Sequence, residues 1–443
     1  MRNKLILVFL TAAVIACSLP AFSQEKEKAP AEAEKKDEKD PSKLYVDLSG
    51  VMYLEWAYFS GFQYTGGSEW GKVYRWGINA DNYYASGVLT DLLGAESTNY
   101  SRKNNNTFRM RRVYLTLKKQ IGEMFSVKVT TDIEPTGQDF IYLKYGFVQF
   151  LKNFGTPVGD VELKAQLGKI ATPVIGMTDY LNDLRWLGPN YLNNSKQVLN
   201  GKSFDDSADL GGAVSLTLFK MLKMEYSFTN GEGYKADNNE TYGGKAHTLL
   251  VSVNPVEYLK EVYVNFYGRW EDTNKNKIDI GVDPPIKYRG VDQRYYIGFG
   301  AAWYSDIIKF GLNFFTPVMH NSQTIFSSID PAEFYGYRSR HKEKFYLIDS
   351  WLNVNLGAIT PAGIIIVGRC AYGKEMKSLL GNDRQSRETI VLAGGAGYQF
   401  SKYFRMVLYY ENTMYRLGTI LHDKLKRDPT PNNNVYIKAE VKY

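Results

Sequence analysis

The sequence predicts an all-β protein, a transmembrane antiparallel β-barrel of about 16 strands with a porin-like architecture. Three observations predict it: apolar and polar residues alternate along the chain, many alternating segments reach about ten residues, and short turns alternate with long polar loops. The mean hydropathy of −0.34 argues against a bundle of membrane-spanning helices. With 44% hydrophobic and 14% aromatic residues, the chain is also too apolar to be disordered.

Composition leaves little material for cofactor chemistry. The chain has four histidines and two cysteines, and the histidines are too far apart in sequence for a zinc motif. A net charge of +7 over 443 residues is too small and too dispersed to favour nucleic acid as a partner. No nucleophile, base and orienting group stand out together. We therefore expect no metal, no cofactor and no enzymatic activity.

The N-terminus predicts export. Arg2 and Lys4 precede an apolar stretch, and Ala21-Phe22-Ser23 offers the small residues that signal peptidase reads, so residues 1–23 are predicted to be a signal peptide. An alternative is that Val14-Ile15-Ala16-Cys17 acts as a lipoprotein box and Cys17 becomes lipidated. If cleavage follows Ser23, Cys370 is the only remaining cysteine and no intramolecular disulfide can form.

Residues 24–43 differ in composition from everything that follows. They are charged, rich in alanine and free of large apolar side chains. Such a segment cannot bury enough surface to offset the entropy of ordering, so we expect a flexible periplasmic spacer. A helical or cell-wall-binding extension is the alternative. The barrel is then expected over residues 44–443.

Period-two alternation marks both ends of that region. Leu48, Met52 and Leu54 share one parity in the first segment, whereas Asp47, Ser49 and Glu55 share the other. The last segment alternates in the same way, with apolar Val435, Ile437, Ala439, Val441 and Tyr443 against Tyr436, Lys438, Glu440 and Lys442. A soluble β-sandwich also alternates, but its strands are usually shorter.

Sixteen segments follow this rhythm, an even number as in bacterial outer-membrane barrels. Short turns such as Lys220-Met221 and Ser401-Lys402 alternate with longer polar loops, which predicts tight periplasmic turns, outer loops and periplasmic termini. The first strand must then pair with the last. The expected strands are 44–58, 107–119, 124–133, 139–150, 160–169, 208–219, 222–230, 244–254, 260–271, 293–304, 308–318, 343–355, 362–373, 387–399, 403–415 and 434–443.

Aromatic residues gather toward the predicted strand ends, where barrels carry girdles at the two membrane interfaces. Cross-strand aromatic pairs in a soluble sheet are the alternative. The residues in question are Trp56, Tyr58, Phe59, Trp270, Trp303, Tyr304, Tyr398, Tyr409 and Tyr410.

If the apolar parity faces lipid, the polar parity lines a channel that is wide enough to hold water. Acidic residues on the same parity, such as Asp132 and Glu162, limit the expected preference for anions to a mild one. Paired wall charges with little selectivity are the alternative. The predicted pore-lining cations are Arg112, Lys118, Lys128, Lys144, Lys164, Arg269 and Arg405.

The third outer loop, residues 170–207, mixes apolar side chains such as Trp186 with many charges. Because so apolar a loop is poorly suited to water, we expect it to fold into the barrel and constrict the channel. A lid or a contact between trimer subunits is the alternative. The predicted constriction residues are Lys169, Asp179, Asp183, Arg185, Lys196 and Lys202.

Several short motifs occur in an order that resembles the phosphate-selective porin O and P family. They are Phe108-Arg109-Met110-Arg111-Arg112-Val113-Tyr114-Leu115, Leu167-Gly168-Lys169 with Pro173 and Gly176, Asp209-Leu210-Gly211, Asn230-Gly231 and Asn254-Pro255. The resemblance implies a sixteen-stranded porin, a homotrimer and a third loop folded inward. Members that prefer phosphate carry a dense run of basic residues along the pore, and the mixed charges of this lumen depart from that pattern.

The leading hypothesis is an outer-membrane porin for the passive diffusion of small hydrophilic solutes, leaning toward anions or phosphate. Its expected partners are outer-membrane lipid, small hydrophilic or anionic solutes, two further copies in a homotrimer, and the barrel-assembly machinery, which would read the C-terminal strand ending in Tyr443. The second hypothesis is a surface-exposed adhesin or binding protein that uses the barrel as a platform for its loops. An outer-membrane enzyme is a third, weaker one.

Overall fold

A computed structural model gives the fold, and the chain divides into two units, residues 1–45 and Val46–Tyr443. The predicted signal peptide, Cys17 and the spacer over 24–43 lie outside the described residues, as do Lys196 and Lys202. The structure describes residues 46–60, 105–134, 140–157, 159–193, 198, 204–231, 233, 245–255, 259, 261–272, 289–326, 336–358, 363–376, 388–416 and 432–443.

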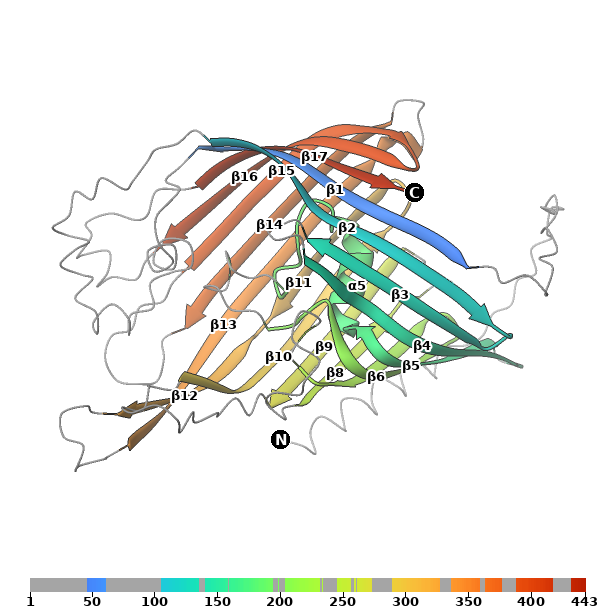
Figure 1. Cartoon of the computed structure of the whole chain (residues 1–443), viewed down its shortest axis with the longest axis horizontal. Helices are drawn as coiled ribbons and strands as arrows, with labels where there is room; N and C mark the ends of the chain where they lie inside the picture. The colour runs from blue at the N-terminus through green and yellow to red at the C-terminus, as the bar shows by residue number, and fades with distance from the viewer. Residues whose placement is uncertain are drawn as a thin grey trace. The chain divides into compact units, whose positions relative to one another are not determined.

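The described part of the chain is built almost entirely of long antiparallel strands (Figure 1). They are β1 (Asp47–Ser60), β2 (Asn105–Ile121), β3 (Phe125–Glu134), β4 (Phe140–Thr156), β5 (Gly159–Ala171), β6 (Ala208–Leu218), β7 (Leu222–Thr229), β8 (Lys245–Val253), β9 (Val262–Asp272), β10 (Arg289–Tyr304), β11 (Ile308–Phe315), β12 (Val318–Phe326), β13 (Gly336–Asn355), β14 (Ile364–Met376), β15 (Glu388–Ser401), β16 (Phe404–Arg416) and β17 (Asn432–Lys442). Helix α5 (Pro173–Asn182) and the short 3₁₀ helix η1 (Leu356–Ala358) complete the described elements.

The strands close into a single barrel. Apart from β11 and β12, each strand pairs with its neighbours along the chain, and β1 pairs with both β2 and β17, so the ring of described strands is closed. Strands β11 and β12 both lie between β10 and β13, interrupted only at Thr316-Pro317, where proline has no N–H to donate. They occupy one strand position, so the barrel has 16, as the sequence predicts.

Closure is made by backbone hydrogen bonds between the two ends of the barrel. The Gly50 N–H donates to the Tyr443 carbonyl at 2.8 Å, and the Tyr443 N–H donates to the Gly50 carbonyl at 3.0 Å. Along the same seam Glu55 lies opposite Lys438. Because hydrocarbon offers no hydrogen bonds, a transmembrane sheet needs this pairing all the way round.

The two faces of the wall differ as the alternation predicts. Leu167 is 72% exposed on the outer face, whereas Lys438 is only 2% exposed inside the barrel. Trp270, Tyr398 and Tyr410 are exposed on the outside, as expected for girdle residues. Tyr304 and Tyr409 were expected among them, and this expectation is wrong: Tyr304 stacks on Tyr180 of the inner helix at 4.8 Å, and Tyr409 is buried inside the barrel, 6.3 Å from the ring of Tyr436.

One end of the barrel carries the short turns, for example Gly122–Met124 between β2 and β3 and Lys402-Tyr403 between β15 and β16. The start of β1 and the end of β17 lie at the same end, because Asp47 pairs with Lys118 close to the β2–β3 turn. The connection between β5 and β6 leaves from the opposite end. It is the third such connection along the chain.

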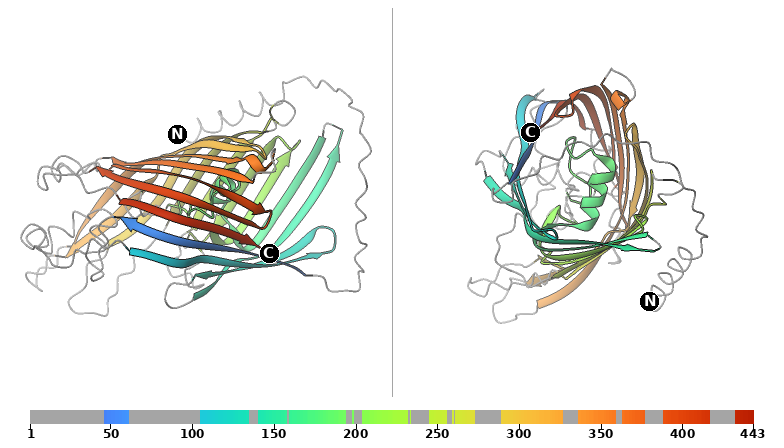
Figure 2. Two further views of the ribbon diagram at one scale, coloured as in Figure 1. Left: turned by 90° about the horizontal axis from the view of Figure 1, so that it is seen from above. Right: turned by 90° about the vertical axis from the view of Figure 1, so that its right-hand side faces the viewer.

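The described part of that third connection lies inside the ring of strands, and with the barrel viewed along its axis α5 is seen within it (Figure 2, right). Thr172 is extended and Pro173 opens the helix, a position at which proline loses no helical hydrogen bond. The helix ends at Asp183, which adopts a left-handed backbone conformation with φ of 49°. Among the described residues, no helix is both long and apolar enough to cross a bilayer.

Candidate functional site

The inner segment, which we define as the described residues 172–193, 198 and 204–207, packs against the barrel through an apolar core. Val174, Ile175, Leu181 and Trp186 are almost fully buried, and Phe204 meets the ring of Phe345 on β13 edge-on at 5.4 Å. Its buried side chains fill part of the barrel interior. Lys169 lies on β5 rather than in the segment, because β5 continues to Ala171.

Asp183 is the first ionic anchor of this segment. Both of its carboxylate oxygens accept hydrogen bonds from the Arg405 guanidinium on β16, at 3.1 Å each. Lys309 on β11 donates to the same carboxylate at 3.3 Å. Arg405 also forms an ion pair with Glu440 on β17 and lies over the indole ring of Trp186 at 4.6 Å. The end of α5 is thereby fixed to three strands.

Backbone carbonyls of the segment supply further anchors. Nη1 of Arg369 on β14 donates to the Pro189 carbonyl at 2.9 Å, while Nε and Nη2 donate to the two carboxylate oxygens of Asp349 on β13 at 3.3 Å and 3.2 Å. The same guanidinium lies 3.9 Å from the centre of the Tyr191 ring. A bidentate carboxylate pair and a stacked ring hold this arginine in one orientation.

The backbone carbonyl of Leu187 accepts hydrogen bonds from two cationic side chains. Arg111 on β2 donates to it at 3.2 Å, and Lys438 on β17 donates to it as well. Both cations also pair with Glu55 on β1, at 3.2 Å and 3.3 Å. Glu55 is 3% exposed, so this carboxylate needs the two cations to offset its loss of solvation.

A fourth anchor holds the far end of the inner segment. The Asp205 carboxylate accepts a hydrogen bond from the Tyr296 hydroxyl on β10 at 2.6 Å and pairs with Arg269 on β9 at 3.1 Å. Arg269 also donates to Glu271 at 2.9 Å, and Glu271 receives Arg294 from β10. Every member of this chain of contacts lies inside the barrel.

The remaining predicted cations near the segment cluster on β2 and β4. Arg112 pairs with Asp132 at 3.1 Å and donates to the Tyr114 hydroxyl at 3.0 Å. The Lys144 ammonium lies 4.0 Å from the centre of the Tyr114 ring. Arg185 comes within 3.7 Å of Asp179, and its two terminal nitrogens are buried without a hydrogen-bond partner among the described residues. Positive charge is therefore concentrated at this part of the inner wall.

The pKa of one aspartate of the inner segment lies below its ordinary value, and the pKa values of two others lie above it. For Asp183 burial raises the pKa, but Arg405 and then Lys309 outweigh it and hold the pKa below its usual range. For Asp206 burial and the neighbouring carboxylates of Asp205 and Asp209 raise the pKa to about 6, against the hydrogen bond from the Ser207 N–H. Burial also raises the pKa of Asp205, in spite of Arg269.

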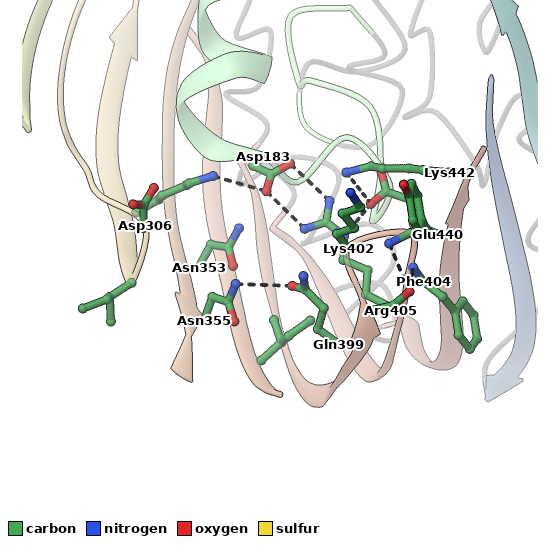
Figure 3. Close-up of a pocket in the computed structure, with 15 residues that line it drawn as sticks. Asp183, Asp306, Asn353, Asn355, Gln399, Lys402, Phe404, Arg405, Glu440 and Lys442 are labelled. Atoms are coloured by element: carbon green, nitrogen blue, oxygen red, sulfur yellow. Dashed lines mark hydrogen bonds and ion pairs between the residues drawn. The ribbon is translucent and has the colours of Figure 1, made fainter. Parts of the chain in front are cut away.

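The described residues line two cavities inside the barrel toward its tight-turn end. The smaller, of about 180 Å³, sits below Asp183 and carries carboxylates, amines and amides side by side (Figure 3). Lys442 pairs there with Glu440 at 3.2 Å, and the Asn355 amide donates to Gln399 at 3.3 Å. Its charges are largely matched.

The larger cavity, of about 790 Å³, extends from the start of α5 to the turn between β6 and β7. Five lysines line it together with two carboxylates, so its wall is positive. The lysines are Lys118, Lys128, Lys164, Lys220 and Lys223, and the carboxylates are Asp47 and Glu225. Met177 and Tyr180 of α5 and Tyr263 of β9 add apolar surface.

The sequence-predicted residues thus separate into four groups. Lys118, Lys128 and Lys164 line the large cavity, Arg405 and Asp183 meet beside the small one, and Arg269 lies in the network around Asp205. Arg112, Lys144, Arg185 and Asp179 lie together between β2, β4 and the inner segment.

Sequence reasoning missed several anchors, namely Arg111, Glu55, Arg369, Asp349, Asp205 and Tyr296. Strict alternation from the inward-facing Arg112 would put Arg111 on the outer face, but the register of β1 with β2 shifts between Tyr53 and Leu54, so that Arg111 has no residue opposite on β1 and can turn inward. Arg369 and Asp349 are charged residues on two neighbouring strands, each with one face toward lipid. Because a charged side chain on such a strand is expected to point into the barrel, these two residues were a usable signal for an internal ion pair.

Among the residues that the structure describes, no group of three or more histidine, cysteine, aspartate or glutamate side chains is arranged to hold a metal ion. The interior offers ion pairs and cavities rather than a coordination site.

No protein-family model matches the sequence, and no curated protein matches it either. In structure the chain is similar to outer-membrane expressed OmpT of Vibrio cholerae, with 10% identity, a TM-score of 0.51, and coverage of 90% of this chain and 97% of that one. It is also similar to the outer membrane channel DcaP of Acinetobacter baumannii, with 11% identity, a TM-score of 0.52, and coverage of 91% and 99%. Identities this low show the shared porin-like fold, and membership of the phosphate-selective porin O and P family stays a prediction.

Proposed function

We propose that this chain forms an outer-membrane channel through which small hydrophilic solutes diffuse passively, with a mild preference for anions. The observation that carries the proposal is the contrast between the two faces of the barrel wall. Its outer face presents large apolar side chains such as Leu167, and its inner face presents charged groups and two cavities lined by charged side chains. A barrel of 16 strands is of the size that holds an aqueous path.

The preference for anions follows from the charge around the large cavity. Lysines outnumber carboxylates there, five against two. A passage with an excess of one sign of charge concentrates ions of the opposite sign. Phosphate would be one such anion, as the resemblance to phosphate-selective porins implies, and it would enter with other small anions rather than exclusively.

Conductance of the purified protein in planar lipid bilayers tests the proposal. The expected result is stable current steps whose reversal potential in a salt gradient lies on the anion-selective side. A correctly folded barrel that never conducts would overturn it. Folding can be verified independently, because closed outer-membrane barrels resist unfolding by detergent unless they are heated.

The location and assembly of the channel belong to the same proposal. Residues 1–23 would direct export, residues 24–43 would span part of the periplasm, and the barrel would lie in outer-membrane lipid. The barrel-assembly machinery would read the C-terminal strand β17, and three copies would assemble side by side. Mass spectrometry of the mature N-terminus and cross-linking of intact cells test cleavage, lipidation of Cys17 and the trimer.

A second candidate is a surface adhesin or binding protein that uses the barrel as a platform. One observation favours it: the inner segment is packed so closely that Leu184, Leu192 and Phe204 have no exposed surface. A barrel blocked by such packing would not conduct. Stable current steps from the wild-type protein would reject this candidate, whereas a sealed barrel that binds to host surfaces would support it.

A further inference from the structure

We propose that the large cavity binds organic anions that carry an aromatic or other apolar group, rather than inorganic anions alone. The inference rests on the proposed channel function, and it names the class of solute that the channel favours. It comes from the two different kinds of wall that the cavity presents: a row of lysines on β2, β3 and β5, and an apolar surface formed mainly by α5.

The cationic wall is built around two lysines on adjacent strands. Lys118 on β2 lies directly opposite Lys128 on β3, and like charges placed opposite each other destabilise a sheet. Asp47 lies opposite Lys118 on the other side, and the Lys128 ammonium lies 5.1 Å from the centre of the Tyr145 ring on β4, which also lines the cavity. A bound anion would lie against both lysines and remove their mutual repulsion.

The other lysines of the cavity are already engaged or stand apart. Lys223 pairs with Glu225 at 2.6 Å, and Lys220 pairs with Asp160 at 3.3 Å. Lys164 is two positions along β5 from Gln166, whose amide donates to Gln149 at 2.9 Å. The amide pair therefore separates the Lys118 and Lys128 pair from Lys164 and provides neutral hydrogen-bonding groups between them.

The apolar wall is aromatic and accessible. Tyr180 is 50% exposed although it lies on a helix inside the barrel, and its ring stacks on Tyr304 at 4.8 Å. Tyr263 meets Tyr180 edge-on at 6.4 Å. Met177 lines the same cavity one helical turn earlier. A half-exposed ring held in a fixed stack is suited to receive a second ring by stacking.

The volume of the large cavity and the chemistry of its two walls fit the same class of ligand, an organic anion with an apolar group. A volume of about 790 Å³ falls within the range of small-molecule sites. An inorganic anion would use only the lysines, whereas an aromatic carboxylate would use the lysines and the tyrosines together. Benzoate and acetate carry the same charge and differ in the apolar group, so the pair isolates the contribution of the apolar wall.

The experiment measures benzoate and acetate in two independent ways at neutral pH. The first is block of the chloride current through the wild-type channel in bilayers, and the second is calorimetric binding to the purified barrel in detergent. We expect benzoate to act at a concentration about tenfold or more below that of acetate. The double variant K118Q/K128Q should raise the benzoate concentration required by about tenfold or more.

Matched variants separate the two walls. Lys119 and Lys152 lie outside the cavity on the same strands as its wall, so K119Q/K152Q removes the same charge and should leave benzoate binding as in the wild type. Tyr180→Ser should reduce the ratio between benzoate and acetate while acetate itself changes little.

The possible outcomes test the proposed binding site and the proposed channel separately. Equal potency of benzoate and acetate, or equal effects of the K118Q/K128Q and K119Q/K152Q variants, would overturn the inference and leave the channel intact. A barrel that does not conduct but binds benzoate through Lys118 and Lys128 would overturn the channel and keep the binding site. Absence of benzoate binding by calorimetry would overturn the inference regardless of conductance.

Discussion

Arg405 on β16 holds both carboxylate oxygens of Asp183, the residue that ends α5, at 3.1 Å each. The two residues are 222 positions apart in the sequence, so this contact ties the inner segment to a strand formed near the end of the chain. Lys309 and Glu440 extend it to β11 and β17. The position of the segment inside the barrel therefore depends on pairing across the barrel as well as on apolar packing.

Arg405→Gln should loosen the end of α5. The substitution removes the bidentate contact and leaves Lys309 as the remaining described hydrogen-bond donor to the Asp183 carboxylate. Loss of hydrogen bonds to a charged group costs about 1–3 kcal/mol, here in the free energy that holds the segment against the wall. We expect larger current fluctuations in single-channel recordings and faster proteolysis of the segment in the folded barrel.

Lys442→Gln is the matched control for Arg405→Gln. Lys442 pairs with Glu440 at 3.2 Å beside the same cavity, but its side chain is 43% exposed, and such pairs contribute about 0–1 kcal/mol. If the two variants give the same recordings and the same proteolysis rate, Arg405 is not an anchor of the inner segment.

Gly373→Ala should displace the returning part of the inner segment. A Cβ at Gly373 would lie 2.0 Å from the carbonyl oxygen of Val198, which is buried against β14. Backbone shifts of this kind typically cost about 1–3 kcal/mol. Gly368→Ala, on the same strand, meets nothing closer than 3.8 Å and should change the free energy of unfolding by less than about 0.5 kcal/mol. Equal thermal unfolding of the two variants would contradict the contact.

Acidification from pH 7 to pH 5 should stabilise the C-terminal end of the inner segment. Burial and two neighbouring carboxylates raise the pKa of Asp206 from its ordinary value of 3.8 to about 6. Between these values the folded state binds the proton and the unfolded state does not, so stability increases as the pH falls through about 6 toward 4. The Asp183 anchor persists over this range, because its pKa lies below the ordinary value and its contribution is lost only at lower pH.

Asp206→Asn tests that assignment. The amide is neutral at every pH, so the variant should be more stable than the wild type at pH 7 and should lose the increase between pH 7 and pH 5. Thermal unfolding in detergent at a series of pH values measures both effects. An unchanged pH dependence in the variant would assign the effect to another group.

The sequence predicted the barrel well because one physical requirement repeats along it. Every transmembrane strand must present apolar groups to lipid on alternate residues, so Leu48 and Ile437 revealed their faces without any knowledge of their neighbours. The short turns and long connections followed from the same rhythm. These features are local, and local patterns can be read from one chain.

The interior was predicted less completely because it depends on contacts across the barrel. Alternation identified Arg405 and Arg269 as inward-facing but could not give Asp183 and Asp205 as their partners. Strict alternation would put Arg111 on the outer face, whereas a single register shift between β1 and β2 turns its side chain inward. Pro173 was a signal for the start of a helix in the inner segment, and the sequence reading did not use it.

The central claim is that the lysines of the inner wall line an aqueous path. The most direct test is to measure the ion selectivity of a variant in which two of these lysines are replaced by glutamate. Lys128 and Lys164 both line the large cavity, and K128E/K164E replaces two positive charges with two negative ones. Reversal potentials of purified wild-type and variant channels in the same salt gradient give the comparison. We expect the variant to shift from anion toward cation preference with a normal folding yield. Unchanged selectivity together with a collapse in folding yield would place these lysines on the lipid-facing side and contradict the claim.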